Sequence, residues 1–173
     1  MTRISVFIFA LSAAAVLGLA TPSFADGPHS RSGGGIPVAT AANGFEEVPA
    51  ILSKGNAAFF AAVNEGAQTI SFKLNFNNLS TNATSATINF AQRGVNGGVV
   101  VFLCGGAAAA CPSGTSGTLT GTITASDVVA VTDQGVAAGS FQDLIDVIAS
   151  GNGYLNVSTA DFPNGEVRGQ IVP

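Results

Sequence analysis

The residues of this chain that could do chemistry are a few carboxylates and one arginine, placed far apart in the sequence. Glu47 precedes a Val-Pro pair, and Glu166 lies two residues before Arg168. Residues i and i+2 share one face of a strand, so Glu166 and Arg168 can form an ion pair, and Glu47 could join them across a sheet. We interpret this group as a structural ion pair that fixes strand register, because structural networks also perturb carboxylates.

The same carboxylates leave two functional alternatives open. Together with Asp161 they could supply oxygen ligands to a calcium ion, although the chain has neither EF-hand spacing nor an Asp-rich repeat. Alternatively, two of them could work as a general acid and a general base. Both alternatives require the carboxylates to converge in one place, which spacing along the chain does not establish.

Imidazole chemistry is nearly absent from this sequence. The chain has a single histidine, His29, within a segment rich in Gly and Ser. Ser-His-Asp and Cys-His arrangements need an ordered imidazole as the base, and zinc and copper sites generally use His or Cys ligands. We therefore expect no catalytic residue, no bound metal and no cofactor.

The first residues of the chain are typical of an export signal. Arg3 precedes an apolar run over residues 4–20, and small residues at Ser23 and Ala25 fit cleavage between Ala25 and Asp26. The alternative is a membrane anchor, but the run is short for a span and no basic residue follows it directly. The sequence predicts a secreted or periplasmic bacterial protein.

Beyond the predicted cleavage point, the chain divides into a short linker and one domain. Residues 26–35 are Gly- and Ser-rich and predict a flexible linker, and residues 36–173 form the predicted domain. The mature chain holds five basic and ten acidic residues, a net charge of −5. This balance argues against nucleic acid and against a membrane surface as partners.

Two cysteines flank a run of small residues in the second half of the chain. Cys104 and Cys111 are separated by six residues, all of them Gly or Ala. In an exported protein such a pair predicts a local disulfide, and the spacing differs from the C-x-x-C of redox proteins. Closing so short a loop contributes roughly 2–3 kcal/mol in the chain-entropy description.

Hydrophobic periodicity indicates many short strands and one helix. The segment 69–76 alternates strictly, with Ile70, Phe72, Leu74 and Phe76 on one face. The segment 99–103 is continuously apolar and predicts a strand covered on both faces. Further strands are predicted at 36–42, 57–63, 87–90 and 117–124.

One segment follows the helical period instead. Apolar residues recur at helical spacing over 140–149, and Ser140 suits the N-cap. A shorter helical turn is predicted near 126–129. Together these elements predict an all-β fold, a Greek-key β-sandwich or barrel of immunoglobulin-like or superoxide-dismutase-like type with one or two short helices.

Three segments carry a resemblance to a known family. They are Gly44-Phe-Glu-Glu-Val-Pro49, Gly94-Val-Asn-Gly-Gly-Val-Val-Val-Phe-Leu103 and the strand–turn–strand pattern of residues 153–171. In this order they resemble the CHRD domain, the module repeated in chordin and found singly in many secreted bacterial proteins. The resemblance covers about residues 37–172 and implies a single copy of the module.

This chain departs from the family pattern at the positions where chemistry would be expected. The resemblance implies a His-x-His pair at Thr87 and Asn89 and a third His at Ser158, a set that could hold a metal. Each of these positions carries a small neutral polar residue here. They could form a neutral pocket that hydrogen-bonds a ligand, but we favour a satisfied polar cluster at a strand end.

The sequence therefore predicts an exported, non-enzymatic module of CHRD type with a binding or structural role. Its expected partner is an extracytoplasmic protein or a glycan, and neither nucleic acid nor, after cleavage, a membrane. Two alternatives stay open. One is a metal-binding or enzymatic CHRD protein with a carboxylate site, and the other is a surface or matrix protein that self-associates through exposed strand edges.

Overall fold

A computed structural model of the protein describes residues 35–173. The predicted signal peptide, its Ala25–Asp26 junction, His29 and nearly all of the predicted linker lie outside the described residues. Within residues 35–173, none of the helices has the length and apolar character needed to span a membrane.

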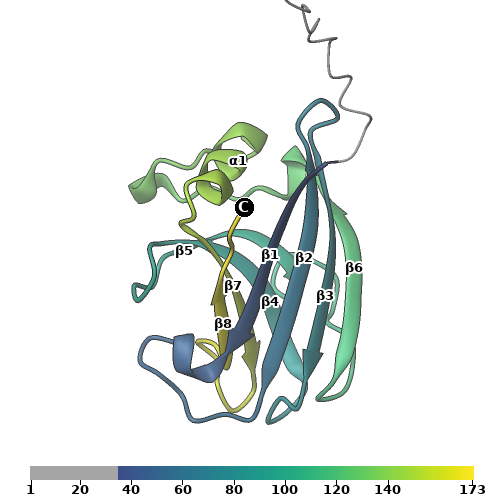
Figure 1. Cartoon of the computed structure of the whole chain (residues 1–173), viewed down its shortest axis with the longest axis vertical. Helices are drawn as coiled ribbons and strands as arrows, with labels where there is room; N and C mark the ends of the chain where they lie inside the picture. The colour runs from purple at the N-terminus through teal and green to yellow at the C-terminus, as the bar shows by residue number, and fades with distance from the viewer. Residues whose placement is uncertain (1–34) are drawn as a thin grey trace, which may run out of the picture. The chain divides into compact units, whose positions relative to one another are not determined.

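Eight strands form one antiparallel sheet that curls into a nearly closed barrel (Figure 1). Along the sheet their order is β5-β4-β7-β8-β1-β2-β3-β6. The strands are β1 (Ile36–Asn43), β2 (Asn56–Asn64), β3 (Thr69–Asn77), β4 (Ala83–Phe90), β5 (Gly98–Cys104), β6 (Gly117–Ile123), β7 (Gly153–Thr159) and β8 (Val167–Gln170). The predicted all-β class is confirmed.

The core lies on the concave side of the sheet, as the strand periodicity predicts. In β3, Ile70, Phe72, Leu74 and Phe76 are all buried, and the residues between them are exposed or half-buried. Phe72 stacks on Phe59 of β2, with ring centroids 6.0 Å apart. Side chains that alternate in this way can face the core only in one register, so the apolar pattern aligns β2 with β3.

One α-helix and three 3₁₀ turns complete the domain. α1 (Phe141–Ala149) begins where predicted, and the Ser140 hydroxyl accepts a hydrogen bond from the Asp143 amide at 3.2 Å. The 3₁₀ turns are η1 (Gly44–Glu46), η2 (Ala125–Asp127) and η3 (Thr132–Gln134). In Figure 1, α1 lies at the upper end of the barrel and η1 at the lower end.

The apolar strand β5 is buried although it does not lie in the middle of the sheet. It lies at one edge of the sheet and pairs only with β4 among the named strands. The chain that follows η2 covers it, since Val101 forms a bridge with Val128 and the Val129 amide donates to the Val100 carbonyl at 2.9 Å. Continuous apolar sequence therefore reports burial on both faces here, and not a central place in the sheet.

The end of β5 carries the predicted disulfide. Cys104 and Cys111 are bonded, with their Cα atoms 4.9 Å apart. The bond closes the Gly- and Ala-rich loop that leaves the sheet at the C-terminal end of β5.

The first and last strands of the domain are neighbours. β1 pairs with β2 along its whole length, and on its other side Asn43 lies opposite Arg168 of β8. Glu47 follows directly after η1, at the end of β1. Residues more than a hundred positions apart in the sequence therefore meet at one place beside the sheet.

Candidate functional site

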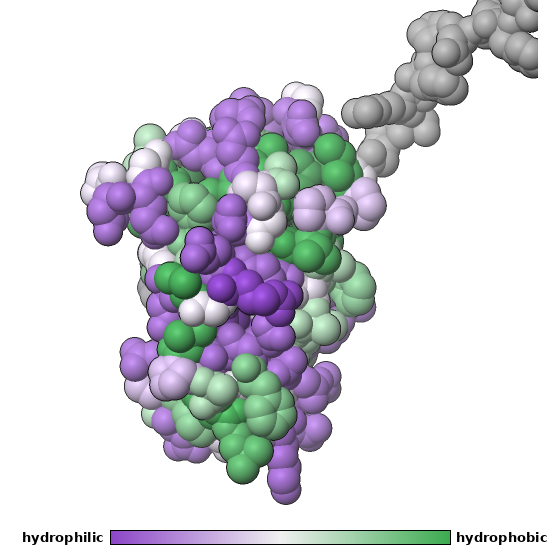
Figure 2. Space-filling view, turned by 60° about the vertical axis from the view of Figure 1, so that its left-hand side comes forward, coloured by the Kyte–Doolittle hydropathy of each residue, from purple (hydrophilic) through white to green (hydrophobic). Residues whose placement is uncertain are grey.

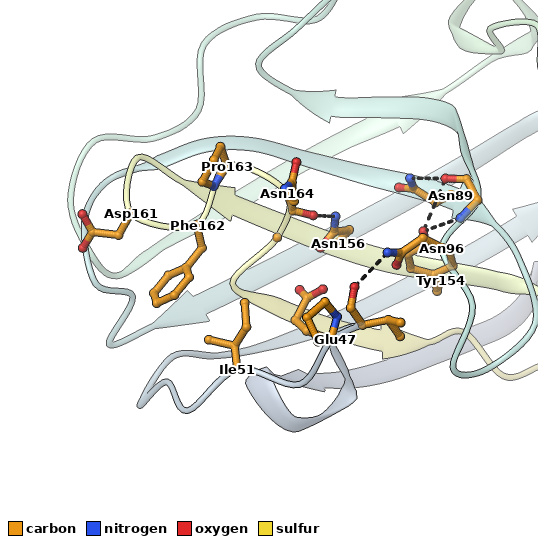
Figure 3. A pocket seen from close by; sticks show the side chains of 14 residues that line it. Glu47, Ile51, Asn89, Asn96, Tyr154, Asn156, Asp161, Phe162, Pro163 and Asn164 are labelled. Atoms are coloured by element: carbon orange, nitrogen blue, oxygen red, sulfur yellow. Dashed lines mark hydrogen bonds between the residues drawn. The ribbon is translucent and has the colours of Figure 1, made fainter.

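A cavity of about 550 Å³ lies beside β4 and β7, on the face of these strands opposite the core (Figure 3). Its lining comes from four parts of the chain: Glu47 with the residues that follow η1, Asn89 of β4 with Asn96 and Gly97 of the next loop, Tyr154 and Asn156 of β7, and the β7–β8 loop over residues 161–165. Loops on three sides and a sheet beneath them make this a suitable place for a ligand.

The strand pleat explains which side chains of β7 reach the cavity. Leu155 and Val157 are fully buried in the core, so Tyr154 and Asn156 point to the other face. Asn89 lies opposite Tyr154 in the register of β4 and β7, and therefore shares their face. The period-two alternation of this strand thus places Tyr154 and Asn156 on one face.

Glu47 is the most unusual side chain of the cavity. It is 7% exposed, and its Oε1 atom has no hydrogen-bond partner. Burial raises its pKa from 4.5 to about 7, an effect that the positive charge of Arg168 only partly offsets. A carboxylate in this position is ionised in only part of the neutral pH range and gains little compensation from the protein.

Asn156 places a second acceptor beside this carboxylate. Its Nδ2 donates to the Asn164 carbonyl at 3.0 Å, which orients the amide, and its buried Oδ1 has no partner. Figure 3 shows the hydrogen bond from Asn156 to Asn164, with the Glu47 carboxylate below them. Two acceptors without a donor in one cavity are uncommon, because buried polar atoms are usually paired.

Gly165 allows these acceptors to approach each other. Its φ is 134°, and a Cβ atom built on it would lie 2.3 Å from Asn156 Oδ1 and 2.6 Å from Glu47 Oε1. Such distances are clashes, so any side chain at this position would push the two acceptors apart. The turn needs glycine both for its backbone conformation and for the space that glycine leaves.

Arg168 is buried and holds the loop between β4 and β5 against the sheet. It is 2% exposed and donates to the Val95 carbonyl at 2.7 Å, the Gln92 carbonyl at 3.3 Å and Asn96 Oδ1 at 3.1 Å. Its guanidinium lies over the Tyr154 ring, 3.6 Å from the centroid. All of these partners are neutral, so Arg168 supports one wall of the cavity by hydrogen bonds and stacking.

The ion pair expected between Glu166 and Arg168 is not formed. Glu166 is fully buried, but it accepts hydrogen bonds from the Ser53 hydroxyl at 2.6 Å, the Ser80 amide and hydroxyl at 2.8 Å each, and the Thr159 hydroxyl at 2.8 Å. The residue lies before β8 begins, next to the irregular backbone of Gly165, so strand alternation does not apply to it.

These contacts give Glu166 the opposite electrostatic character to Glu47. Burial by itself would raise the pKa of Glu166, but the hydrogen bonds from Ser53, Ser80 and Thr159 outweigh it and lower the pKa below 4.5. Glu166 is therefore ionised and hydrogen-bonded, whereas Glu47 is buried and its Oε1 atom has no hydrogen-bond partner. A carboxylate that is already satisfied is a structural group and is poorly placed to recognise a ligand.

The carboxylates do not gather into one site. Glu47 and the exposed Asp161 both line the cavity, but Glu166 belongs to a separate network. Across residues 35–173 no three His, Cys, Asp or Glu side chains come together in a way that could hold a metal ion. The salt bridge found in this part of the chain joins Arg93 and Glu46, near the protein surface.

The three positions where the family resemblance implies histidines are only partly brought together. The Thr87 hydroxyl donates to Asn89 Oδ1 at 2.6 Å, and Asn89 Nδ2 donates to the Gly97 carbonyl at 3.2 Å. Thr87, Asn89 and Ser158 are all buried, but Ser158 lies opposite Ser85 and does not line the cavity. Thr87 and Asn89 thus satisfy each other, as expected for a structural polar pair.

A family comparison accounts for this architecture. The family model described as CHRD domain matches residues 38–171. The chain belongs to the CHRD family. Comparison with curated proteins and with solved structures found no match. All residues that line the cavity fall inside the matched span of this CHRD domain, so the cavity is part of the module itself.

Sequence reasoning identified Glu47, Asp161 and Asn89, but it grouped the carboxylates with Glu166 and Asn89 with Thr87 and Ser158. It missed Asn96, Asn156 and Gly165 as site residues. Asn156 could have been chosen from its place on the polar face of β7 next to Tyr154. Asn96 and Gly165 lie in loops, where no periodicity shows which way a residue points.

Proposed function

We propose that this CHRD domain is an exported, non-enzymatic binding module whose ligand occupies the cavity beside Glu47. The observation that carries the proposal is the pair of buried acceptors, Glu47 Oε1 and Asn156 Oδ1, that have no donor. Leaving a buried polar group unpaired costs about 1–3 kcal/mol. A ligand that supplies the missing donors offsets this cost on binding.

Export is supported by two features of the chain. The predicted cleavage after Ala25 would release a mature protein into the periplasm or the medium. The disulfide between Cys104 and Cys111 suits those oxidising compartments. Cell fractionation and the mass of the mature protein test this part, since a chain that begins at Asp26 and is found outside the cytoplasm is the expected result.

A binding role fits the cavity better than catalysis does. Glu47, with a pKa of about 7, has the acidity of a general base. However, the lining residues include no Ser, Thr, Cys, His or Lys, and the Tyr154 hydroxyl is hydrogen-bonded to the backbone of Gly97. Asp161, the other carboxylate of the cavity, is exposed.

A decisive test compares a blocked cavity with a matched surface change. Asn164→Trp places an indole at the mouth of the cavity and keeps the backbone carbonyl that Asn156 uses. Asn77→Trp changes an exposed residue at the end of β3, away from the cavity. Ligand screening by NMR against panels of amines, sugars, carboxylates and metal ions should give shifts at Glu47 and Gly165 in the parent and in Asn77→Trp, but not in Asn164→Trp. Shifts that survive in Asn164→Trp would contradict the proposal.

Self-association is a second candidate, supported by the edge of the sheet. β6 pairs with β3 on one side only, and most of its residues are exposed or half-buried. An unpaired strand edge can add a strand from another copy. Light scattering on the exported protein tests this candidate: a mass that rises with concentration supports it, and a constant monomer mass excludes it.

A further inference from the structure

We infer that the cavity binds an alkylammonium group, held between the Glu47 carboxylate and Asn156 Oδ1. This inference rests on the proposed binding function and names the chemical class of its ligand. A primary ammonium carries three N–H donors and a positive charge on a small tetrahedral head. The cavity presents the complementary arrangement.

Hydrogen bonding favours a donor as the ligand head group. Glu47 Oε1 and Asn156 Oδ1 are both buried acceptors without partners, and they lie 2.6 Å and 2.3 Å from the position that a Cβ atom on Gly165 would take. Turning the Asn156 amide over would not remove the mismatch, because its Nδ2 already donates to the Asn164 carbonyl at 3.0 Å. Ligand donors that reach both oxygens would satisfy them at once.

Charge favours a cation. The residues that line the cavity include two carboxylates, Glu47 and Asp161, and no Lys, Arg or His. Arg168 is the cation whose charge Glu47 senses, but its guanidinium is occupied by loop carbonyls, Asn96 and the Tyr154 ring. A buried carboxylate without a counter-ion is costly, so a ligand cation is stabilised here and an anion is repelled.

The remaining walls favour an alkyl chain behind the charged head. The apolar lining residues are Val48, Pro49, Ile51, Phe162 and Pro163. In Figure 3, Ile51 and Phe162 lie at one end of the cavity, and Glu47 and Asn156 lie further along it. Methylene groups that pack on these side chains are removed from water, which favours binding.

The surface beside the cavity continues this apolar wall. Phe45 is 69% exposed and Leu52 is 88% exposed, and both belong to the segment that carries Glu47. Figure 2 shows hydrophobic residues gathered at the lower end of the domain, where η1 and its following loop lie in Figure 1. The shared ligand chemistry, an amine on an alkyl chain, occurs both in free amines and in lysine side chains of peptides.

Calcium fits the same groups less well. Calcium takes six to eight oxygen ligands at 2.3–2.6 Å. The cavity offers one buried carboxylate, one free amide oxygen and the exposed Asp161, and its volume of about 550 Å³ is far larger than a metal ion requires. The apolar wall would have no role in a calcium site.

Ammonium binding should depend on pH through Glu47. Arg168 of β8 acts on its charge, and Asp161 of the β7–β8 loop and Tyr154 of β7 are the other titratable groups that line the cavity. The pKa of Glu47 is about 7 in the free protein, so below pH 7 most Glu47 side chains are protonated and must lose the proton before they can hold a cation. Affinity should therefore be about tenfold weaker at pH 6 than at pH 8.

The test uses isothermal titration of the exported, disulfide-bonded protein with three probes. These are 1,5-diaminopentane, the peptide acetyl-Gly-Lys-Gly-amide, and calcium chloride. Glu47→Gln is the test variant, and Glu65→Gln is the control, because Glu65 is an exposed acid outside this cavity. Asn164→Trp is a second test variant, which leaves Glu47 in place.

The inference predicts saturable amine binding at pH 8, weakened at least tenfold by Glu47→Gln and by Asn164→Trp and unchanged by Glu65→Gln. Binding of the diamine alone points to free amines, and binding of the peptide points to lysine side chains. Equal amine affinity in the parent and Glu47→Gln, or tight calcium binding lost in Glu47→Gln, overturns the inference. If sugars or anions shift the NMR signals of Glu47 and Gly165 while amines do not, the ammonium inference fails and the proposed binding function stands. If no class of probe shifts these signals, both the inference and the proposed function fail.

Discussion

Replacing Glu47 with Gln should stabilise this protein above neutral pH. Glu47 is 7% exposed and makes no hydrogen bond through Oε1, so its ionised form carries a desolvation penalty. Gln has the same shape and no charge, and its amide can donate toward Asn156 Oδ1. The substitution thus removes the penalty and offers a donor to the unpaired acceptor beside it.

The magnitude follows from the pKa of Glu47. Burial raises this pKa from 4.5 to about 7, so the folded protein holds the proton more tightly than the unfolded chain. The stability that protonated Glu47 contributes is fully present below pH 4.5 and is lost as the pH rises to about 7. Each unit of pKa corresponds to 1.36 kcal/mol, which gives an upper limit of about 3 kcal/mol for the loss.

The assay is urea unfolding from pH 4.5 to pH 8.5, with the disulfide kept oxidised, for the parent, Glu47→Gln and the control Glu65→Gln. Differences between the parent and each variant cancel the titration of all other groups, including Glu166. We expect Glu47→Gln to match the parent near pH 4.5 and to exceed it by about 2–3 kcal/mol at pH 8.5. The control should follow the parent within about 0.5 kcal/mol at every pH.

Two results would refute this reasoning. A stability difference that is the same at pH 4.5 and pH 8.5 would mean that the pKa of Glu47 does not differ between the folded and unfolded states. A destabilised Glu47→Gln at pH 8.5 would mean that the ionised carboxylate makes favourable contacts, and the argument for an unsatisfied ligand site would fail with it.

Four further variants test the surrounding structure by urea unfolding. Glu166→Gln should lower the unfolding free energy by roughly 2 kcal/mol at pH 7, because hydroxyl and amide donors lose a charged acceptor. The pKa of Glu166 is lowered in the folded state, so this contribution is present above pH 4.5 and should disappear in stronger acid. A loss of stability that does not change with pH would count against this. Arg168→Met should cost about 3 kcal/mol because it removes the hydrogen bonds that the buried guanidinium donates to the β4–β5 loop, and a cost below 1 kcal/mol would show that the loop holds without them. Gly165→Ala should cost about 1–3 kcal/mol from its positive φ and the clash with two acceptors, and a neutral effect would show that the turn can relax. Replacing Cys104 and Cys111 together with Ser should cost roughly 2–3 kcal/mol, and a smaller cost would show that the short loop is already ordered.

Several elements of this protein could be predicted from the sequence because their causes are local. The alternation from Ile70 to Phe76 places one side of β3 in the core whatever its neighbours are. Ser140 begins α1 because its hydroxyl reaches an amide only three residues away. Cys104 and Cys111 meet because the short loop between them keeps them close. The resemblance of three short segments to the CHRD family was confirmed over residues 38–171.

Only the tertiary structure decided which of the two buried carboxylates, Glu47 or Glu166, lacks hydrogen-bond donors. Glu47 and Glu166 each precede a valine, and neither local sequence shows which of the two carboxylates finds hydrogen-bond donors. Glu166 is satisfied by Ser53 and Ser80, which lie 113 and 86 positions away, and Glu47 is left without a donor in the cavity. Such partners are set by the order of strands in the sheet and by the path of loops. Hydrophobic periodicity reports burial along one strand, and it carries no information about strand order or the path of loops.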